Sequence, residues 1–120
     1  MARKKQFKHR FNFKPLSANK MFYRAKQLTK EYRQWREDIY EDVDKSKKWP
    51  FGELASLEFT VKVGFSSRLA DVDNAIKPLL DTFQYLFAFN GRCVYKVTIE
   101  KEIVKKGQEY FDVIVTEYGG

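Results

Sequence analysis

The stretch DVDNAIKPLLD, residues 71–81, combines residue types and spacings that could do chemistry. Three carboxylates, those of Asp71, Asp73 and Asp81, lie around a single lysine, Lys77. Two like charges about 4 Å apart repel each other by roughly 4 kcal/mol at an effective dielectric constant of about 20, so one ammonium group does not offset three acids. Divalent cations such as Mg²⁺ are held by one or two carboxylates together with phosphate oxygens and waters, and would supply the missing positive charge.

The spacing of these residues predicts that they lie together at the start of a helix. The preceding residues alternate as a strand, and Asp73 or Asn74 is the expected N-cap of the helix that follows. Asp73, Lys77 and Asp81 are spaced by four residues and would share one helix face. Asp71, two residues before Asp73 in extended chain, would point the same way. We therefore expect Asp71 and Asp73 to bind a divalent metal, with Asp81 as a further candidate ligand.

A purely structural interpretation of the same stretch stays open. Asp73 could serve only as a helix cap, and Lys77 and Asp81 only as an exposed ion pair worth a few tenths of a kcal/mol. Pro78 would fall within the first helical turn or just beyond it, where a missing amide is tolerated. The spacing alone favours neither the metal site nor the cap.

Composition narrows the class of protein. With 120 residues the chain is long enough for one domain with a single core. The 23 basic residues exceed the 16 acidic ones and give a net charge of +7, which favours nucleic acid or an acidic membrane surface as partner, unless the charge only keeps the protein in solution. Cys93 is the only cysteine, which excludes an internal disulfide and favours a reducing, cytoplasmic compartment. No apolar run reaches the roughly 20 residues that span a bilayer, and the basic N-terminus lacks the apolar segment of a secretory signal.

Hydrophobic periodicity predicts the elements that must position the acidic stretch. Alternation of apolar and polar residues predicts a strand over 6–15. A helix about 40 Å long is predicted over 19–44, with Ser17 or Asn19 as its N-cap. Its apolar face repeats at steps of three and four residues and consists of Met21, Ala25, Leu28, Tyr32, Trp35, Ile39 and Val43.

The remainder of the chain predicts a loop, a helix and three strands. A segment with proline and glycine, 44–53, predicts the loop, and a strand is predicted over 56–65. Beyond the helix that the acidic stretch opens, strands over 93–104 and 109–118, joined by a turn at 105–108, predict a hairpin. The order strand, long helix, strand, shorter helix, strand, strand favours a single α+β domain with its helices packed against a small mixed sheet.

The stretch DVDNAIKPLLDTFQ closely resembles the signature of the RusA-type Holliday junction resolvases, a family common in prophages. That signature has a D-x-D-N tetrad, a lysine three residues after the asparagine, and an aspartate four residues after the lysine. The segment KPLSANKMFYR, residues 14–24, is similar to the family's P-x-S-x-N-x-x-Y-R segment. The strand before the motif and the closing hairpin fall where the family has them, so the resemblance covers nearly the whole chain.

This resemblance implies a RusA-like nuclease fold over residues 1–120 and a Mg²⁺-dependent homodimer that nicks two opposed strands of a four-way DNA junction, a step of recombination and repair. By motif position, it implies that Asp71 and Asp73 are metal-binding carboxylates and that Lys77 is an essential basic residue. Basic residues outside the motif would bind DNA phosphates without reading sequence, the candidates being Arg3, Lys4, Lys5, Arg68 and Arg92.

The chain departs from the family's pattern at one position. The family has its third catalytic carboxylate beyond the second helix, where this chain reads FNGRCVY, and Gly91 stands at the carboxylate's place. Asn90, Asp81 or Glu100 could donate an oxygen instead, although none of them matches the pattern. We expect the chain to bind junctions and to cut them slowly or not at all, whether it is a degenerate relative or a disabled variant. The alternatives are a protein that binds branched DNA without cutting it, and a basic scaffold domain whose acids only cap a helix.

Overall fold

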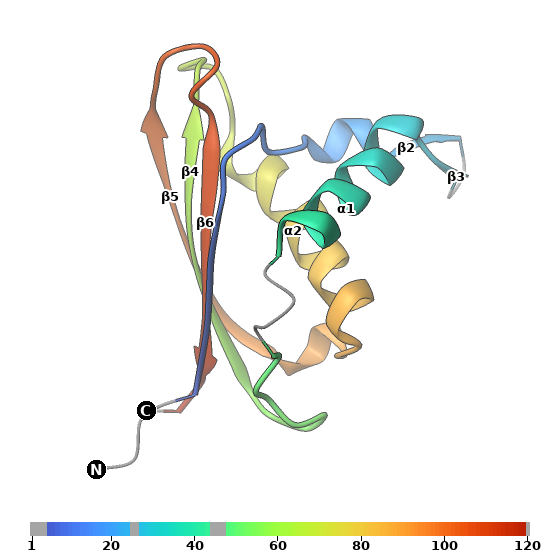
Figure 1. Ribbon diagram of the computed structural model, residues 1–120, viewed down its shortest axis with the longest axis vertical. Coiled ribbons are helices and arrows are strands. Elements are labelled where there is room, and N and C mark those ends of the chain that lie inside the picture. Colours follow the sequence, from blue (N-terminus) through green and yellow to red (C-terminus); the bar gives the residue numbers. More distant parts are fainter. Residues whose placement is uncertain (1–4, 25–26, 44–47, 120) are drawn as a thin grey trace.

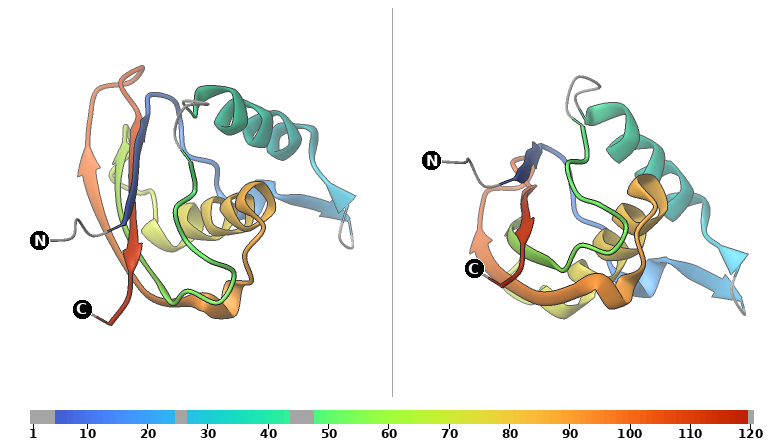
Figure 2. Two further views of the ribbon diagram at one scale, coloured as in Figure 1. Left: turned by 60° about the horizontal axis from the view of Figure 1, so that its bottom comes forward. Right: turned by 90° about the horizontal axis from the view of Figure 1, so that it is seen from below.

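A four-stranded mixed sheet with two helices on one face makes up most of the molecule (Figures 1 and 2). The computed structural model describes residues 5–24, 27–43 and 48–119. The sheet has the order β1-β6-β4-β5, in which only the pairing of β4 with β5 is parallel. The predicted α+β class with a small mixed sheet is confirmed.

The elements, in chain order, are β1 (Gln6–Phe11), the 3-10 helix η1 (Ala18–Lys20), β2 (Phe22–Arg24), β3 (Gln27–Leu28), α1 (Lys30–Asp42), β4 (Leu57–Phe65), α2 (Val72–Phe87), the 3-10 helix η2 (Gly91–Cys93), β5 (Val94–Ile103) and β6 (Tyr110–Glu117).

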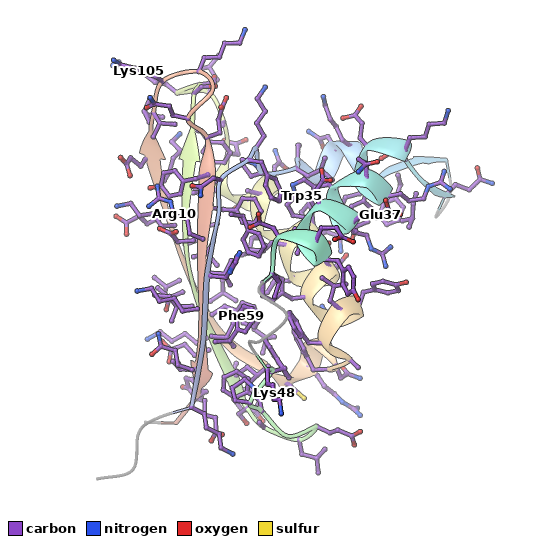
Figure 3. The ribbon with its side chains drawn as sticks, viewed as in Figure 1. Arg10, Trp35, Glu37, Lys48, Phe59 and Lys105 are labelled. Carbon is purple, nitrogen blue, oxygen red and sulfur yellow. The ribbon has the colours of Figure 1, made fainter. Side chains whose placement is uncertain are left out.

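The core lies between the sheet and the helices and is rich in phenylalanine. The predicted alternation of β4 is confirmed, since Leu57, Phe59, Val61 and Val63 are all buried on the helix side. Phe59 points from β4 toward the helices (Figure 3). Phe83 of α2 is fully buried, and its ring centroid lies 5.9 Å from that of Phe59. Each such side chain contributes roughly 1.5–3 kcal/mol by leaving water, so this contact fixes α2 firmly against the sheet.

The predicted helix over 19–44 is wrong in its first half. The described residues 18–24 and 27–28 instead contain η1 and the two short strands β2 and β3, and α1 begins only at Lys30. Thr29 is extended, and its side chain accepts a hydrogen bond from the Tyr32 amide at 3.0 Å, which makes it the N-cap of α1. The Thr29 amide donates to the Met21 carbonyl at 3.0 Å, so the chain folds back on itself before the helix starts.

The apolar face predicted for that helix is therefore confirmed only in its second half. Tyr32, Trp35 and Ile39 are buried along α1, and Trp35 donates its indole N–H to the Lys14 carbonyl at 2.9 Å. Met21 is buried but lies outside any helix, and Ala25 lies outside the described residues. Ser17, one of the two predicted N-caps, does cap a helix, the short η1.

The predicted hairpin of the last two strands is also wrong, because β4 lies between β5 and β6 in the sheet. After β5 the Val104 amide donates to the Phe65 carbonyl at 2.8 Å, and the chain then passes over the end of β4 to enter β6. The two strands differ in burial in a way that explains this order. β6 buries Val113 and Val115, whereas β5 is mostly exposed and carries lysines and glutamates, which suit the edge of a sheet.

Candidate functional site

Asp71 and Asp73 lie at the start of α2, just past the end of β4. Asp71 itself is the N-cap, with an extended backbone (φ −96°, ψ 131°), and Asp73 lies in the first turn. The predicted cap at Asp73 or Asn74 is thus wrong by two or three residues, since the Asn74 amide already donates to the Asp71 carbonyl at 3.2 Å. Pro78 consequently falls in the second turn of α2, where it is buried.

The Asp71 side chain occupies the cap position without acting as a cap. Its carboxylate makes no capping hydrogen bond to the first turn of α2. Both Asp71 and Asp73 are exposed, and neither side chain forms a hydrogen bond or an ion pair with the part of the chain that the structure describes. Both carboxylates lie at the positive end of the helix dipole, which stabilises a charge there by about 0.3–1 kcal/mol. Two carboxylates therefore remain available to a ligand.

A small pocket of about 190 Å³ opens beside Asp71. Asp71, Asn74 and Ser17 are the polar residues of its lining. The segment 15–17, which belongs to the second stretch of family resemblance, forms part of the opposite wall. The pocket could hold several waters, each of which takes about 30 Å³ in the liquid. The full lining is Pro15, Leu16, Ser17, Phe65, Leu69, Ala70, Asp71, Asn74 and Ala75.

The first turn of α2 adds hydrogen-bond donors to the same place. The leading amides of an α-helix have no intrahelical acceptor, and together with the helix dipole they favour a phosphate or another anion. The Asn74 amide donates to the Asp71 carbonyl, but the Asp71 side chain satisfies none of the leading amides, so those of Val72 and Asp73 stay open to such a group. Hard oxygen ligands for a cation and amide donors for a phosphate thus lie within one helical turn of each other.

Lys77 and Asp81 form a separate pair farther along the helix. The Lys77 ammonium lies 3.5 Å from the Asp81 carboxylate, and both side chains are partly exposed. Asp81 is ten residues beyond Asp71, about 15 Å along a helix axis, which is too far for one metal ion to touch both. Lys77 is one turn beyond Asp73, so it could still reach a phosphate group bound at the start of α2.

Within the described residues, no three His, Cys, Asp or Glu side chains are grouped as a metal site would need. Glu100, another candidate for a third ligand, lies opposite Lys62 in the sheet register, on the face away from α2. The acidic group at the start of α2 is therefore a pair of carboxylates with Asn74 beside it.

The position of the expected third carboxylate lies at the other end of α2. A Cβ atom at Gly91 would stand 2.9 Å from Oε1 of Gln84, which is 13 residues beyond Asp71. At 1.5 Å per residue that separation is about 20 Å. The sheet gives the same result: Val94 pairs with Leu57 at the start of β4, whereas Asp71 follows its far end. Residue 91 does not approach Asp71 and Asp73 within one chain. Asn90 is also engaged, since its side chain accepts from the Arg92 amide at 3.0 Å.

The basic residues predicted to contact DNA lie at both ends of the molecule. Arg68 is exposed in the loop that leads to Asp71. Arg92 is exposed beside Gly91, and Lys5 lies 3.9 Å from Glu117 at that same end of the sheet. Arg3 and Lys4 lie outside the described residues.

The loop that carries Asp71 is held by two residues that the sequence did not single out. The Lys101 ammonium of β5 donates to the carbonyls of Arg68 at 3.0 Å and Ala70 at 2.9 Å. Glu109, buried just before β6, accepts the Ser66 hydroxyl at 2.9 Å. Hydrogen bonds from its own backbone amide and from Ser66 lower the pKa of Glu109. Neither residue has a local sequence signal, because pairing with β4 is what brings each of them to this loop. Lys101 arrives through the parallel pairing of β5 with β4, and Glu109 through the antiparallel pairing of β6 with β4.

Comparisons with known proteins do not add to this geometry. No protein-family model matches the chain, and no curated protein matches it in sequence. In the described residues, no helix is both long enough and apolar enough to cross a membrane.

Proposed function

We propose that this protein is a Mg²⁺-dependent endonuclease that acts on branched DNA, nicking opposed strands of a four-way junction as a homodimer. The observation that carries the proposal is the pair of exposed carboxylates at the start of α2, one of which occupies the cap position without capping. The resemblance of residues 71–84 to the RusA-type signature and the net charge of +7 support DNA as the substrate.

The donor set fits a magnesium ion. Mg²⁺ prefers oxygen ligands and keeps several waters, and it is bound through one or two carboxylates plus substrate phosphates rather than by a full protein cage. Asp71 and Asp73 would hold the ion, with the Asn74 side chain as a further oxygen donor at the pocket. When bound, the ion would polarise a phosphoryl oxygen and lower the pKa of a bound water.

Groups of the chain itself would bind the scissile phosphate and stabilise the charge of the transition state. The open amides at the start of α2 would bind a non-bridging oxygen of the scissile phosphate. Lys77 would offset negative charge that grows on the phosphate or on the leaving oxygen in the transition state. Arg68 would contact the neighbouring DNA backbone without reading its sequence.

Cleavage of a synthetic four-way junction tests the proposal. The protein is incubated with the junction and, in parallel, with linear duplex of the same sequence, with Mg²⁺ and with a chelator. We expect junction nicks that are symmetric and depend on Mg²⁺, and little cleavage of the duplex. Cleavage that survives the chelator, or that does not distinguish the two substrates, would contradict the proposal.

A second function is favoured by one observation: the described residues offer only two grouped carboxylates at the site. A less constrained ion places the reacting groups less accurately, and small misplacements cost on the order of 100-fold in rate. The protein would then bind branched DNA without cutting it. Tight, salt-sensitive junction binding with no nicks at any Mg²⁺ concentration would establish this alternative.

A further inference from the structure

The loop between β4 and α2 determines where the Asp71 carboxylate stands. Its internal hydrogen bonds are few and long: the Ala70 amide donates to the Ser67 carbonyl at 3.3 Å, and the Leu69 amide to the Ser67 hydroxyl at 3.2 Å. The Leu69 side chain is 92% exposed and adds no packing. A segment with so little internal support needs contacts from elsewhere to keep one conformation.

Lys101 supplies those contacts from β5. In the sheet register it pairs with Val63, whose side chain faces the helices, so the Lys101 side chain stands on the same side as α2. Its ammonium donates to two backbone carbonyls of the loop, those of Arg68 and Ala70. The Ala70 carbonyl belongs to the peptide plane that ends in the Asp71 nitrogen, so this bond fixes the plane from which Asp71 begins.

The chemistry of lysine suits this task. An ammonium group has three donors, and two of them are used on these carbonyls. Hydrogen bonds from a charged donor are roughly twice as strong as neutral ones. The positive charge is also bonded to Ala70, the residue that directly precedes Asp71.

Lys96 provides a comparison on the same strand. It lies opposite Glu58, whose side chain faces away from the helices, and its ammonium is 3.9 Å from the Glu58 carboxylate. Being on β5 is therefore not enough to bring a lysine to this loop. Lys101 reaches it because of its place along the strand and because its side chain stands on the helix side of the sheet.

We propose that Lys101 is a positioning residue that holds the loop 68–70, so that the Asp71 carboxylate faces the metal at the start of α2. This inference rests on the proposed function, since the orientation of Asp71 matters to activity only if that carboxylate binds a metal. Partners that orient metal ligands in this way typically change metal affinity or activity 10- to 100-fold when they are removed.

The first test measures Mn²⁺ affinity by isothermal titration for the parent, Lys101→Met, Lys101→Arg and Lys96→Met. We expect Lys101→Met to weaken Mn²⁺ binding 10- to 100-fold. Lys101→Arg, which keeps the charge and several donors, should recover most of the affinity. Lys96→Met removes one positive charge from the same strand and should stay within about twofold of the parent. Parent-like affinity in Lys101→Met would overturn the proposal.

The second test measures hydrogen exchange of single amides by NMR, without any metal. In Lys101→Met the Ala70 and Asn74 amides should exchange several-fold faster, because their acceptors, the Ser67 and Asp71 carbonyls, directly flank the released segment 68–70. The Val104 amide, bonded to the Phe65 carbonyl, should keep its rate and report an intact sheet. Unchanged exchange at Ala70 and Asn74 would overturn the proposal independently of metal.

The two tests separate the two claims. A parent that binds no Mn²⁺, together with faster exchange at Ala70 in Lys101→Met, would overturn the proposed metal-dependent function and leave the role of Lys101 in holding the loop supported. A parent that binds Mn²⁺, together with a Lys101→Met variant unchanged in both measurements, would overturn the role of Lys101 and leave the proposed function in place.

Discussion

At the scale of single residues, the Asp71 side chain bears on two interpretations that the sequence left equal, a metal site and a helix cap. An aspartate at an N-cap normally accepts a hydrogen bond from the second or third amide of the helix. Asp71 stands at that position and its side chain does not do so. Spacing drew attention to Asp71 and Asp73, but only the backbone shows that the cap is Asp71, two or three residues before the predicted one, and that its carboxylate makes no capping hydrogen bond.

The first prediction concerns both carboxylates. Asp71→Asn and Asp73→Asn should each weaken Mn²⁺ binding at least tenfold, because each change removes a charged ligand, and each should abolish Mg²⁺-dependent cleavage. Junction binding should stay the same or tighten, since a charge that repels phosphate is lost. Titration calorimetry and a gel-shift assay measure the two effects.

Asp81→Asn is the matched control for that prediction, because Asp81 is an acid of the same helix that pairs with Lys77 at 3.5 Å. It should leave Mn²⁺ affinity within about twofold and cost only a few tenths of a kcal/mol of stability, as exposed pairs at this spacing do. If Asp71→Asn and Asp81→Asn weakened Mn²⁺ binding equally, these acids would attract the ion only through their negative charge and not as direct ligands.

At the scale of elements, alternation predicted the four strands of the main sheet, whereas helical periodicity failed over β2 and β3, where local hydrogen bonds compete. The buried positions of β1 and β4 follow from the sequence because each strand has one face in the core. The helix expected over 19–44 fails because Thr29 caps a new helix and draws its backbone to Met21, a contact between residues eight apart that no 3.6-residue pattern contains. The hairpin of β5 and β6 fails because a short connection indicates neighbouring strands but does not require them to pair.

The outer face of the sheet contains a tight contact that the sequence does not reveal. A Cβ atom at Gly64 would lie 2.4 Å from two ring carbons of Tyr110. The ring is held in place, since its hydroxyl donates to Glu102 at 2.5 Å and the Arg10 guanidinium lies 3.9 Å from its centroid on the face away from the helices (Figure 3). Glycine is thus required at position 64 because the Tyr110 ring lies against its backbone, and not because of an unusual backbone angle.

The second prediction follows from this contact. Gly64→Ala should destabilise the protein by roughly 1–3 kcal/mol, because the added methyl group must displace an anchored ring. Chemical denaturation measures the change. Gly52→Ala is the control, since nothing lies within 4 Å of its Cβ position, and it should change stability by less than about 0.5 kcal/mol.

The third prediction concerns the same ring at high pH. Burial, together with the hydrogen bond to Glu102, raises the pKa of Tyr110 to about 12 from the usual 10. Because the folded state holds this proton more tightly than the unfolded state, its contribution to stability is complete below pH 10 and is lost as the pH rises toward 12. Tyr110→Phe should therefore lose stability less steeply than the parent between pH 10 and 12 in urea titrations. Identical slopes for the two proteins would refute the assignment to Tyr110.

At the scale of the whole molecule, β5 is an edge strand with no neighbour on its outer side in the described sheet. It also exposes apolar side chains, among them Tyr95, Val97 and Ile103. Open edges with apolar side chains are surfaces on which a second chain can pair or pack. These features agree with the homodimer implied by the family resemblance, and two symmetric sites are what paired nicks in a junction require.

The fourth prediction is that the protein sediments as a dimer at micromolar concentration, with twice the chain mass of 14.3 kDa. Its affinity for junction DNA should also fall steeply with salt, because each neutralised phosphate releases counterions. Analytical ultracentrifugation and binding at two salt concentrations test these points. A species of 14.3 kDa at all concentrations would contradict the dimer.

The last prediction concerns Gly91, where the sequence and the fold lead to different expectations. Pattern matching places a missing third carboxylate at this residue, yet within one chain it lies about 20 Å from Asp71, at the opposite end of α2. Gly91 is not among the described glycines with positive φ, and the nearest atoms to its Cβ position belong to the flexible Gln84 side chain, so Gly91→Asp should fold normally. We expect this variant to bind Mn²⁺ with less than a twofold change in affinity in isothermal titration, and Gly91→Asn, which has the same size without the charge, to behave alike. If Gly91→Asp instead binds Mn²⁺ tenfold more tightly and cuts junctions faster while Gly91→Asn does not, the added carboxylate must reach Asp71 and Asp73 from a second chain, because the length of α2 forbids it within one.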